Sequence, residues 1–109
     1  MKIAVTGGRN YDDKSTVYAA LDSLRPTHLI LGDASGADTL ALHYALDYGV
    51  FFQVFGADWD KWGKTAGPIR NGEMIHIGKP DCLAAFPGGW GTKNCKWVAT
   101  NAGVPVINY

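Results

Sequence analysis

Residues 81–92 read Asp-Cys-Leu-Ala-Ala-Phe-Pro-Gly-Gly-Trp-Gly-Thr, an apolar run followed directly by a glycine-rich turn. The run at 81–86 is too short for a helix and is typical of a buried strand, and a helix is expected from about Thr92 to Ala102. Glycines between a strand and a helix let backbone N–H groups approach an anion at the positive end of the helix dipole. The stretch therefore predicts a phosphate-binding turn, unless glycine is needed only for a tight β-to-α turn. Its expected ligand-binding residues are Pro87, Gly88, Gly89, Gly91 and Thr92.

The same alternation of strand and helix runs through the whole chain. Apolar runs at 2–6, 27–31, 50–55 and 104–108 predict four more strands, and helical spacing follows the first two of them, at 17–24 and 37–48. A third helix is expected to start at Pro68, at its first helical position, and to end before Gly78. Continuous apolar strands are typical of a parallel sheet buried on both faces. We therefore expect one domain, residues 1–109, with a Rossmann-like three-layer α/β sandwich, a five-stranded parallel sheet and about four helices.

Open parallel sheets bind ligands outside the carboxyl ends of their strands, where neighbouring loops part. After the first strand come Gly7, Gly8 and Arg9, where a phosphate or ribose could rest on the backbone while the guanidinium donates hydrogen bonds. An exposed turn with a solvated arginine is the alternative. Tyr11 is a candidate to cover a base. After the second strand, Ser35 and Asp38 have the form of a capping box, so ligand contact is expected more from the backbone of Gly36 than from Asp38.

The segment after the third strand is the richest in candidate side chains. Asp58 and Trp59 could hydrogen-bond a ribose and stack a base, although Trp59 and Trp62 could equally plug the core. Arg70 and Asn71 follow Pro68, and a cation in the first turn of a helix is unfavourable unless an anion shares the site. A partner carboxylate such as Glu73 is the competing explanation for Arg70.

The amino-acid composition limits the classes of binding partner that we expect. Ten basic and ten acidic residues give a formal net charge of zero, and no run of residues carries charges of one sign. We therefore expect the protein to bind a small molecule rather than a nucleic acid. There is no long apolar segment at the start of the sequence and none of membrane-spanning length, so we expect a cytoplasmic protein. Cys82, Cys95 and the three histidines are scattered, so neither a metal nor a cofactor is expected.

Taken in order, the segments 7–9, 36–38, 57–59, 66–71 with Met74, and 85–92 resemble the SLOG superfamily, in its small YspA-like branch. The resemblance implies a Rossmann-like domain that binds nucleotides or nucleotide-derived ligands, with enzymes and sensors of bacterial and phage conflict systems among its members. It also implies pairing through helices, so a dimer is expected. Lonely Guy enzymes, which look similar through the glycine turn, cleave the N-glycosidic bond of nucleoside monophosphates. They use an arginine that Arg70 matches and a glutamate three residues beyond the turn's threonine.

At that glutamate position this chain has Cys95, and a thiol with an ordinary pKa near 8.5 cannot stabilise an oxocarbenium-like centre as a carboxylate does. Two hypotheses follow. The first is a binding protein that senses, sequesters or carries a nucleotide. The second is a phosphoribohydrolase in which Arg70 and another acid are catalytic, the acid being Glu73 or, in its place, Asp33 or Asp58. Binding of single-stranded DNA, as in the DprA relatives, is disfavoured by the zero net charge.

Overall fold

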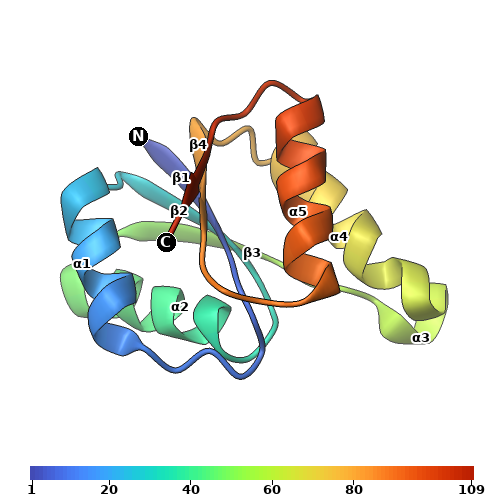
Figure 1. The fold of residues 1–109 in the computed structure, drawn as a ribbon, viewed down its shortest axis with the longest axis horizontal. Helices are drawn as coiled ribbons and strands as arrows, with labels where there is room; N and C mark the ends of the chain where they lie inside the picture. The colour runs from blue at the N-terminus through green and yellow to red at the C-terminus, as the bar shows by residue number, and fades with distance from the viewer.

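The computed structural model describes residues 1–109, which form a five-stranded, all-parallel sheet with helices on both faces (Figure 1). The strands are β1 (Lys2–Thr6), β2 (His28–Gly32), β3 (Phe51–Phe55), β4 (Cys82–Ala85) and β5 (Val106–Asn108). The helices are α1 (Lys14–Leu24), α2 (Ala37–Tyr48), α3 (Trp59–Trp62), α4 (Ala66–His76) and α5 (Trp90–Asn101), with a 3-10 turn, η1, at Gly63–Thr65. The Rossmann-like sandwich is confirmed, with the short α3 and η1 added to the four longer helices.

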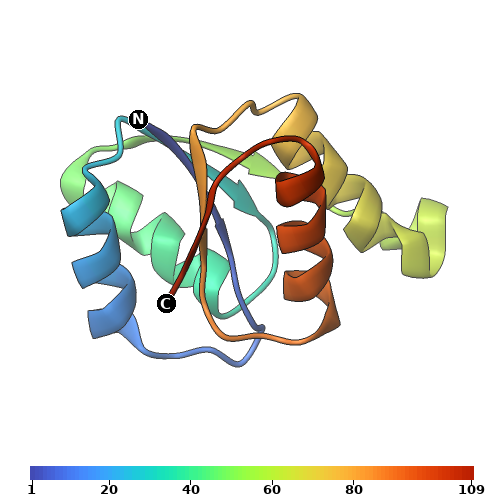
Figure 2. The same ribbon diagram turned by 45° about the horizontal axis from the view of Figure 1, so that its top comes forward.

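The central strands divide their side chains between two cores. Ile3 and Val5 of β1 point toward α1 and α2, whereas Ala4 between them points toward Met74 of α4 and Cys95 of α5. This alternation is the period of two that a strand imposes on its side chains. Figures 1 and 2 show the result, with α1 and α2 on one side of the sheet and α4 and α5 on the other.

The strand order is β3-β2-β1-β4-β5. The chain builds outward from β1 through β2 to β3 and then crosses back to place β4 on the free side of β1. The loops after β1 and β4 therefore leave the sheet in opposite directions, which makes this point the topological switch point where open α/β sheets bind ligands. The two loops are joined by a hydrogen bond from the Gly8 N–H to the Pro87 carbonyl, with an N···O distance of 2.9 Å.

Three local predictions were wrong. Helix α4 begins at Ala66 rather than Pro68, because the chain enters it directly from η1, so Arg70 lies beyond the first turn. Helix α5 begins at Trp90 rather than Thr92. The N-cap of α2 is Gly36 rather than Ser35, whose hydroxyl donates to the Arg9 carbonyl instead.

The prediction that every strand is buried on both faces was also wrong for the two edge strands, β3 and β5. β1, β2 and β4 are almost entirely buried, but every residue of β3 is exposed or only half-buried, and so is every residue of β5 at the other edge. β3 pairs with β2 alone, so the apolar run Phe51–Phe55 reflects strand propensity without burial. No helix of the structure is both long enough and apolar enough to cross a membrane.

Candidate functional site

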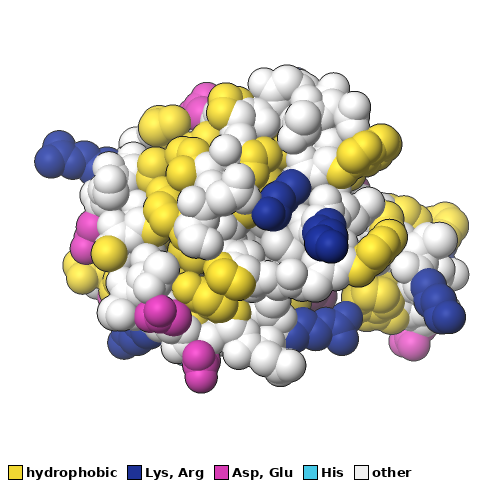
Figure 3. Space-filling model, viewed as in Figure 1, with side chains coloured by type: hydrophobic (Ala, Val, Ile, Leu, Met, Phe, Trp, Pro, Cys, Tyr) yellow, Lys and Arg dark blue, Asp and Glu magenta, His cyan; other side chains and the backbone are white.

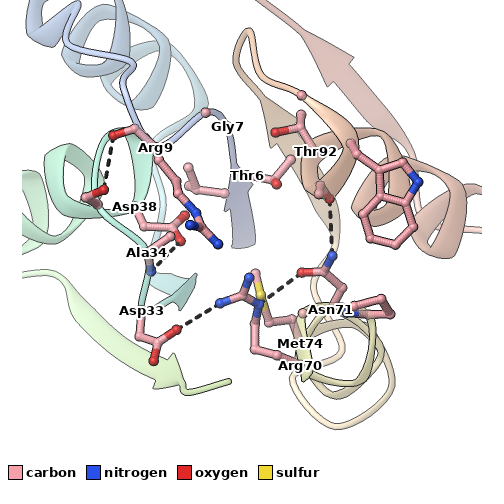
Figure 4. A pocket seen from close by; sticks show the side chains of 18 of the residues that line it. Thr6, Gly7, Arg9, Asp33, Ala34, Asp38, Arg70, Asn71, Met74 and Thr92 are labelled. Carbon is pink, nitrogen blue, oxygen red and sulfur yellow. Dashed lines mark hydrogen bonds and ion pairs between the residues drawn. The ribbon is translucent and has the colours of Figure 1, made fainter. Parts of the chain in front are cut away.

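The loops after β1, β2 and β4, together with α3, η1 and the start of α4, surround a cavity of about 1080 Å³ (Figure 4). Its position at the carboxyl ends of β1, β2 and β4 is the one expected of this strand order. Ten of the residues singled out from sequence line it: Gly7, Gly8, Arg9, Asp38, Trp59, Arg70, Asn71, Gly89, Gly91 and Thr92.

Helix α5 presents unbonded backbone donors to this cavity. Its N-cap is Gly89, which offers no side-chain hydrogen bond, and the N–H groups of Trp90, Gly91 and Thr92 have no acceptor in the protein. These are the donors that an α-helix leaves unsatisfied at its start. All four of these residues line the cavity, so the helix offers it both donors and the positive end of its dipole.

The glycines of the turn fall into two groups. At Gly88, a Cβ would run into the Thr92 hydroxyl and would lie 2.7 Å from the Gly8 nitrogen, so packing alone requires glycine there. At Gly89 and Gly91, a Cβ would meet no atom within 4 Å, and neither residue has a positive φ. Packing therefore requires glycine at Gly88 and does not require it at Gly89 or Gly91.

The loop after β1 is held by its own close contacts. A Cβ at Gly7 would lie 2.5 Å from the Ala37 Cβ, and one at Gly36, where φ is +76°, would run into the Gly8 carbonyl. The start of α2 thus packs directly on the backbone of this loop, and the Ala37 N–H donates to the Gly8 carbonyl. Gly36 does not line the cavity, and its role in the structure is this close approach.

Arg70 is engaged by protein groups on two sides. Its Nη1 lies 2.9 Å from Oδ1 of Asp33, the residue that directly follows β2, and its Nε donates to Oδ1 of Asn71 (Figure 4). Asn71 in turn donates from Nδ2 to the Gly91 carbonyl and to Oδ1 of Asn94. Asn71 is therefore a brace between α4 and the start of α5. The partner carboxylate of Arg70 is Asp33 rather than Glu73, which lies on α4 outside the cavity.

Asp38 is a buried carboxyl group within the cavity. Its side chain accepts a hydrogen bond from the Ala34 N–H at 3.2 Å, and the residue is only 7% exposed. Burial raises its pKa to about 6, although Arg70 and the Ala34 N–H act in the opposite direction. The cavity thus contains an acid that changes its charge near neutral pH.

Arg9 and Lys64 are cations without a carboxylate partner, because the ion pair between Arg70 and Asp33 is the only one in the structure. The Arg9 guanidinium carbon lies 5.6 Å from the ring centre of Trp59, and Figure 4 shows the Arg9 side chain reaching into the cavity. Three cations and two carboxylates line the cavity, so its charge is positive, and more so when Asp38 is protonated.

Cys95, at the position of the Lonely Guy glutamate, lies in the core between the sheet and α5. It has no exposed surface, it does not line the cavity, and burial raises the pKa of its thiol to about 11. The group is therefore a neutral, packed side chain at neutral pH, and it supplies neither a negative charge nor a proton acceptor to the cavity.

The remaining predicted residues lie outside the cavity. The Tyr11 ring packs against Phe86, with ring centres 5.6 Å apart, and Asp58 caps α3 by accepting from the Lys61 N–H. The Pro87 carbonyl accepts the hydrogen bond from the Gly8 N–H. Trp59 and Trp62 are 46% and 47% exposed, so neither plugs the core.

Ten residues that line the cavity were not among the predicted ligand-binding residues: Val5, Thr6, Asp33, Ala34, Ser35, Lys64, Gly67, Pro68, Met74 and Trp90. Asp33, which the sequence suggested only as a substitute acid, lies two residues beyond the predicted strand 27–31, and this position was the signal that could have identified it. Trp90 belongs to the predicted glycine-rich turn, which was the signal for its position, whereas Lys64 belongs to a 3-10 turn that the pattern did not predict.

The strand order and the donor-lined cavity at the switch point define a Rossmann-like domain with an anion-receptive site. Residues 1–62, more than half of the chain, match the model of the YspA, cpYpsA-related SLOG family. The chain is also 40% identical to the gene 61 protein of Mycobacterium phage D29, in an alignment that covers 99% of this chain and 95% of the relative. The protein belongs to the YspA, cpYpsA-related SLOG family, which confirms the resemblance found in its motifs.

Proposed function

We propose that the protein binds a nucleotide or nucleotide-derived ligand and acts as a sensor, sequestering protein or carrier. The observation that carries this proposal is the start of α5, where three unbonded N–H groups face a cavity that also holds the unpaired Arg9. A phosphate group satisfies such donors and gains from the helix dipole and from a charge-assisted hydrogen bond to a guanidinium. The family supports a nucleotide-related function in general terms.

Other residues of the cavity can contact the base and the ribose of a nucleotide. Trp59 and Trp90 both line it and are exposed, so their rings are available to stack on a base. The side chain of Asp33 is also exposed and can accept a hydrogen bond from a ribose hydroxyl. The volume of about 1080 Å³ is slightly above the usual range of about 300–1,000 Å³ for small-molecule sites, so the cavity has room for a ligand larger than a mononucleotide.

The test is to denature the purified protein, identify any released nucleotide by mass spectrometry, and measure thermal shifts with mono-, di- and cyclic nucleotides and ADP-ribose. Ligand at about 100 times its dissociation constant adds about 2.7 kcal/mol of stability, which a melting curve resolves readily. The proposal predicts a shift with at least one phosphorylated nucleotide and a smaller one with its nucleoside. No shift with any of these ligands would contradict it.

A phosphoribohydrolase is the second candidate, and one observation favours it: Arg70 and the buried acid Asp38 line the same cavity. An acid whose pKa is raised by burial is suited to protonating a leaving group. Asp38 would then take the role considered for Glu73, which lies outside the cavity. Release of free base from a nucleoside monophosphate, lost in Asp38→Asn, would establish this reaction, and absence of release at high protein concentration would exclude it.

We expect the partner to be a small molecule in the cytoplasm rather than a nucleic acid. The formal net charge is zero, and Figure 3 shows charged side chains of both signs spread over one face of the molecule. Retention on heparin at physiological salt would contradict this expectation.

A further inference from the structure

Strand β3 is an unprotected sheet edge. It pairs with β2 at all five of its residues, without a bulge, and its outer side has no partner (Figure 2, β3 in green). Phe51, Phe52 and Val54 are 73%, 42% and 44% exposed, and the strand contains no charged residue and no proline. Charge, proline and bulges are the usual means of keeping an edge from pairing with another chain, and β3 has none of them.

Helix α2 carries a further exposed apolar side chain, Leu46. Tyr44 of the same helix faces α1, because its hydroxyl donates a hydrogen bond to Asp22 of that helix. Leu46 comes two residues later and so lies roughly 200° around the helix axis from Tyr44. Leu46 is therefore on the side of α2 away from α1, and it is 62% exposed.

The sequence of β3 is complementary to itself. In an antiparallel pair centred on Gln53, Phe51 lies opposite Phe55 of a second copy, Phe52 lies opposite Val54, and Gln53 lies opposite Gln53. Aromatic and β-branched pairs of this kind stabilise antiparallel strands, and no like charges are brought together. We propose that two copies of the chain pair antiparallel through β3, about Gln53, to form one continuous ten-stranded sheet with two-fold symmetry.

The area available fits a dimer of moderate strength. From their exposed fractions, Leu46, Phe51, Phe52 and Val54 present on the order of 400 Å² per copy. Two copies present on the order of 800 Å² of this side-chain surface, which with the paired backbone sets an upper limit close to the roughly 1,000 Å² of a small specific interface. A dimer that dissociates at micromolar concentration is therefore expected. This interface uses a sheet edge, whereas the family resemblance implied pairing through helices.

Sedimentation velocity on the full chain, over about 1 to 500 µM, tests the proposal. The native protein is expected to pass from monomer to dimer over this range. Phe52→Lys with Val54→Lys, and separately Phe52→Glu with Val54→Glu, place like charges opposite one another, so each variant alone is expected to be a monomer. An equimolar mixture of the two pairs lysine with glutamate at both positions and is expected to restore the dimer.

Trp97→Lys is the matched control, because Trp97 is 66% exposed on α5, away from β3, and this variant is expected to dimerise like the native protein. Thermal melting of each variant checks that it folds. A native protein that stays monomeric at every concentration would overturn the proposal, and so would a dimer that persists in either charged variant. A mixture that stays monomeric would overturn the pairing about Gln53.

Discussion

The substitution Gly91→Ala tests whether glycine is needed at position 91 for ligand binding or for packing. Gly91 is the second residue of α5, and an added Cβ would meet no atom within 4 Å. Alanine is favoured over glycine in a helix by up to about 1 kcal/mol, so the free energy of unfolding should stay the same or rise slightly. In the proposed complex, the methyl group is expected to crowd the anion at the unbonded N–H groups. Loss of a hydrogen bond to a charged group costs about 1.5–3 kcal/mol, which is a roughly ten- to hundredfold loss of affinity.

Gly88→Ala is the matched control, because its Cβ would overlap the Thr92 hydroxyl and crowd the Gly8 nitrogen. Such overpacking typically costs about 1–3 kcal/mol of stability. Urea unfolding gives the stability of both variants, and calorimetric titration gives their affinity for the nucleotide with the largest thermal shift. Native affinity in Gly91→Ala would rule out the ligand-binding role of this glycine. A loss of stability in Gly91→Ala as large as that in Gly88→Ala would show that Gly91 is kept for packing.

Three further substitutions test two charged residues of the cavity and Cys95 in the core. Arg9→Ala removes a cation without a carboxylate partner, so phosphate affinity should fall about tenfold while stability changes by less than about 0.5 kcal/mol; a large loss of stability in urea would contradict this. Burial raises the pKa of Asp38 from 3.8 to about 6, so the contribution of this one group to native stability is lost as the pH rises through that interval. Relative to the native protein, Asp38→Asn should therefore gain on the order of 2–3 kcal/mol between about pH 4 and pH 7.5, and an equal difference at both pH values would count against this. Cys95→Glu places a carboxyl group in the core, so unfolding should become easier by more than about 3 kcal/mol without any base release; a stable, active variant would show that residue 95 reaches the cavity.

The strands and longer helices could be predicted because their apolar periodicity is local and strong. β3 shows the limit of that reasoning, since Phe51 and Val54 favour a strand whether or not anything covers them. The start of α4 was predicted from Pro68 alone, and the preceding turn moved it to Ala66. This shift also removed the helix-dipole argument for Arg70.

The candidate site was predictable where residues directly follow a strand. The glycine turns after β1 and β4 line one cavity because parallel strands end at one edge of the sheet. The pairing of Arg70 with Asp33 joins positions 37 residues apart and depends on tertiary structure, as does the exclusion of Glu73 from the cavity. Burial of Asp38 and Cys95 likewise depends on packing between elements, which spacing alone does not reveal.

Amide chemical shifts recorded while a nucleoside monophosphate is added would locate the bound phosphate on the chain. If the phosphate rests on the start of α5, the largest changes will fall on the N–H groups of Trp90, Gly91 and Thr92, with further changes at Arg9. The same titration with the unphosphorylated nucleoside should leave the α5 amides nearly unchanged. Saturable binding that shifts other parts of the chain and leaves these three amides unmoved would contradict phosphate binding at α5.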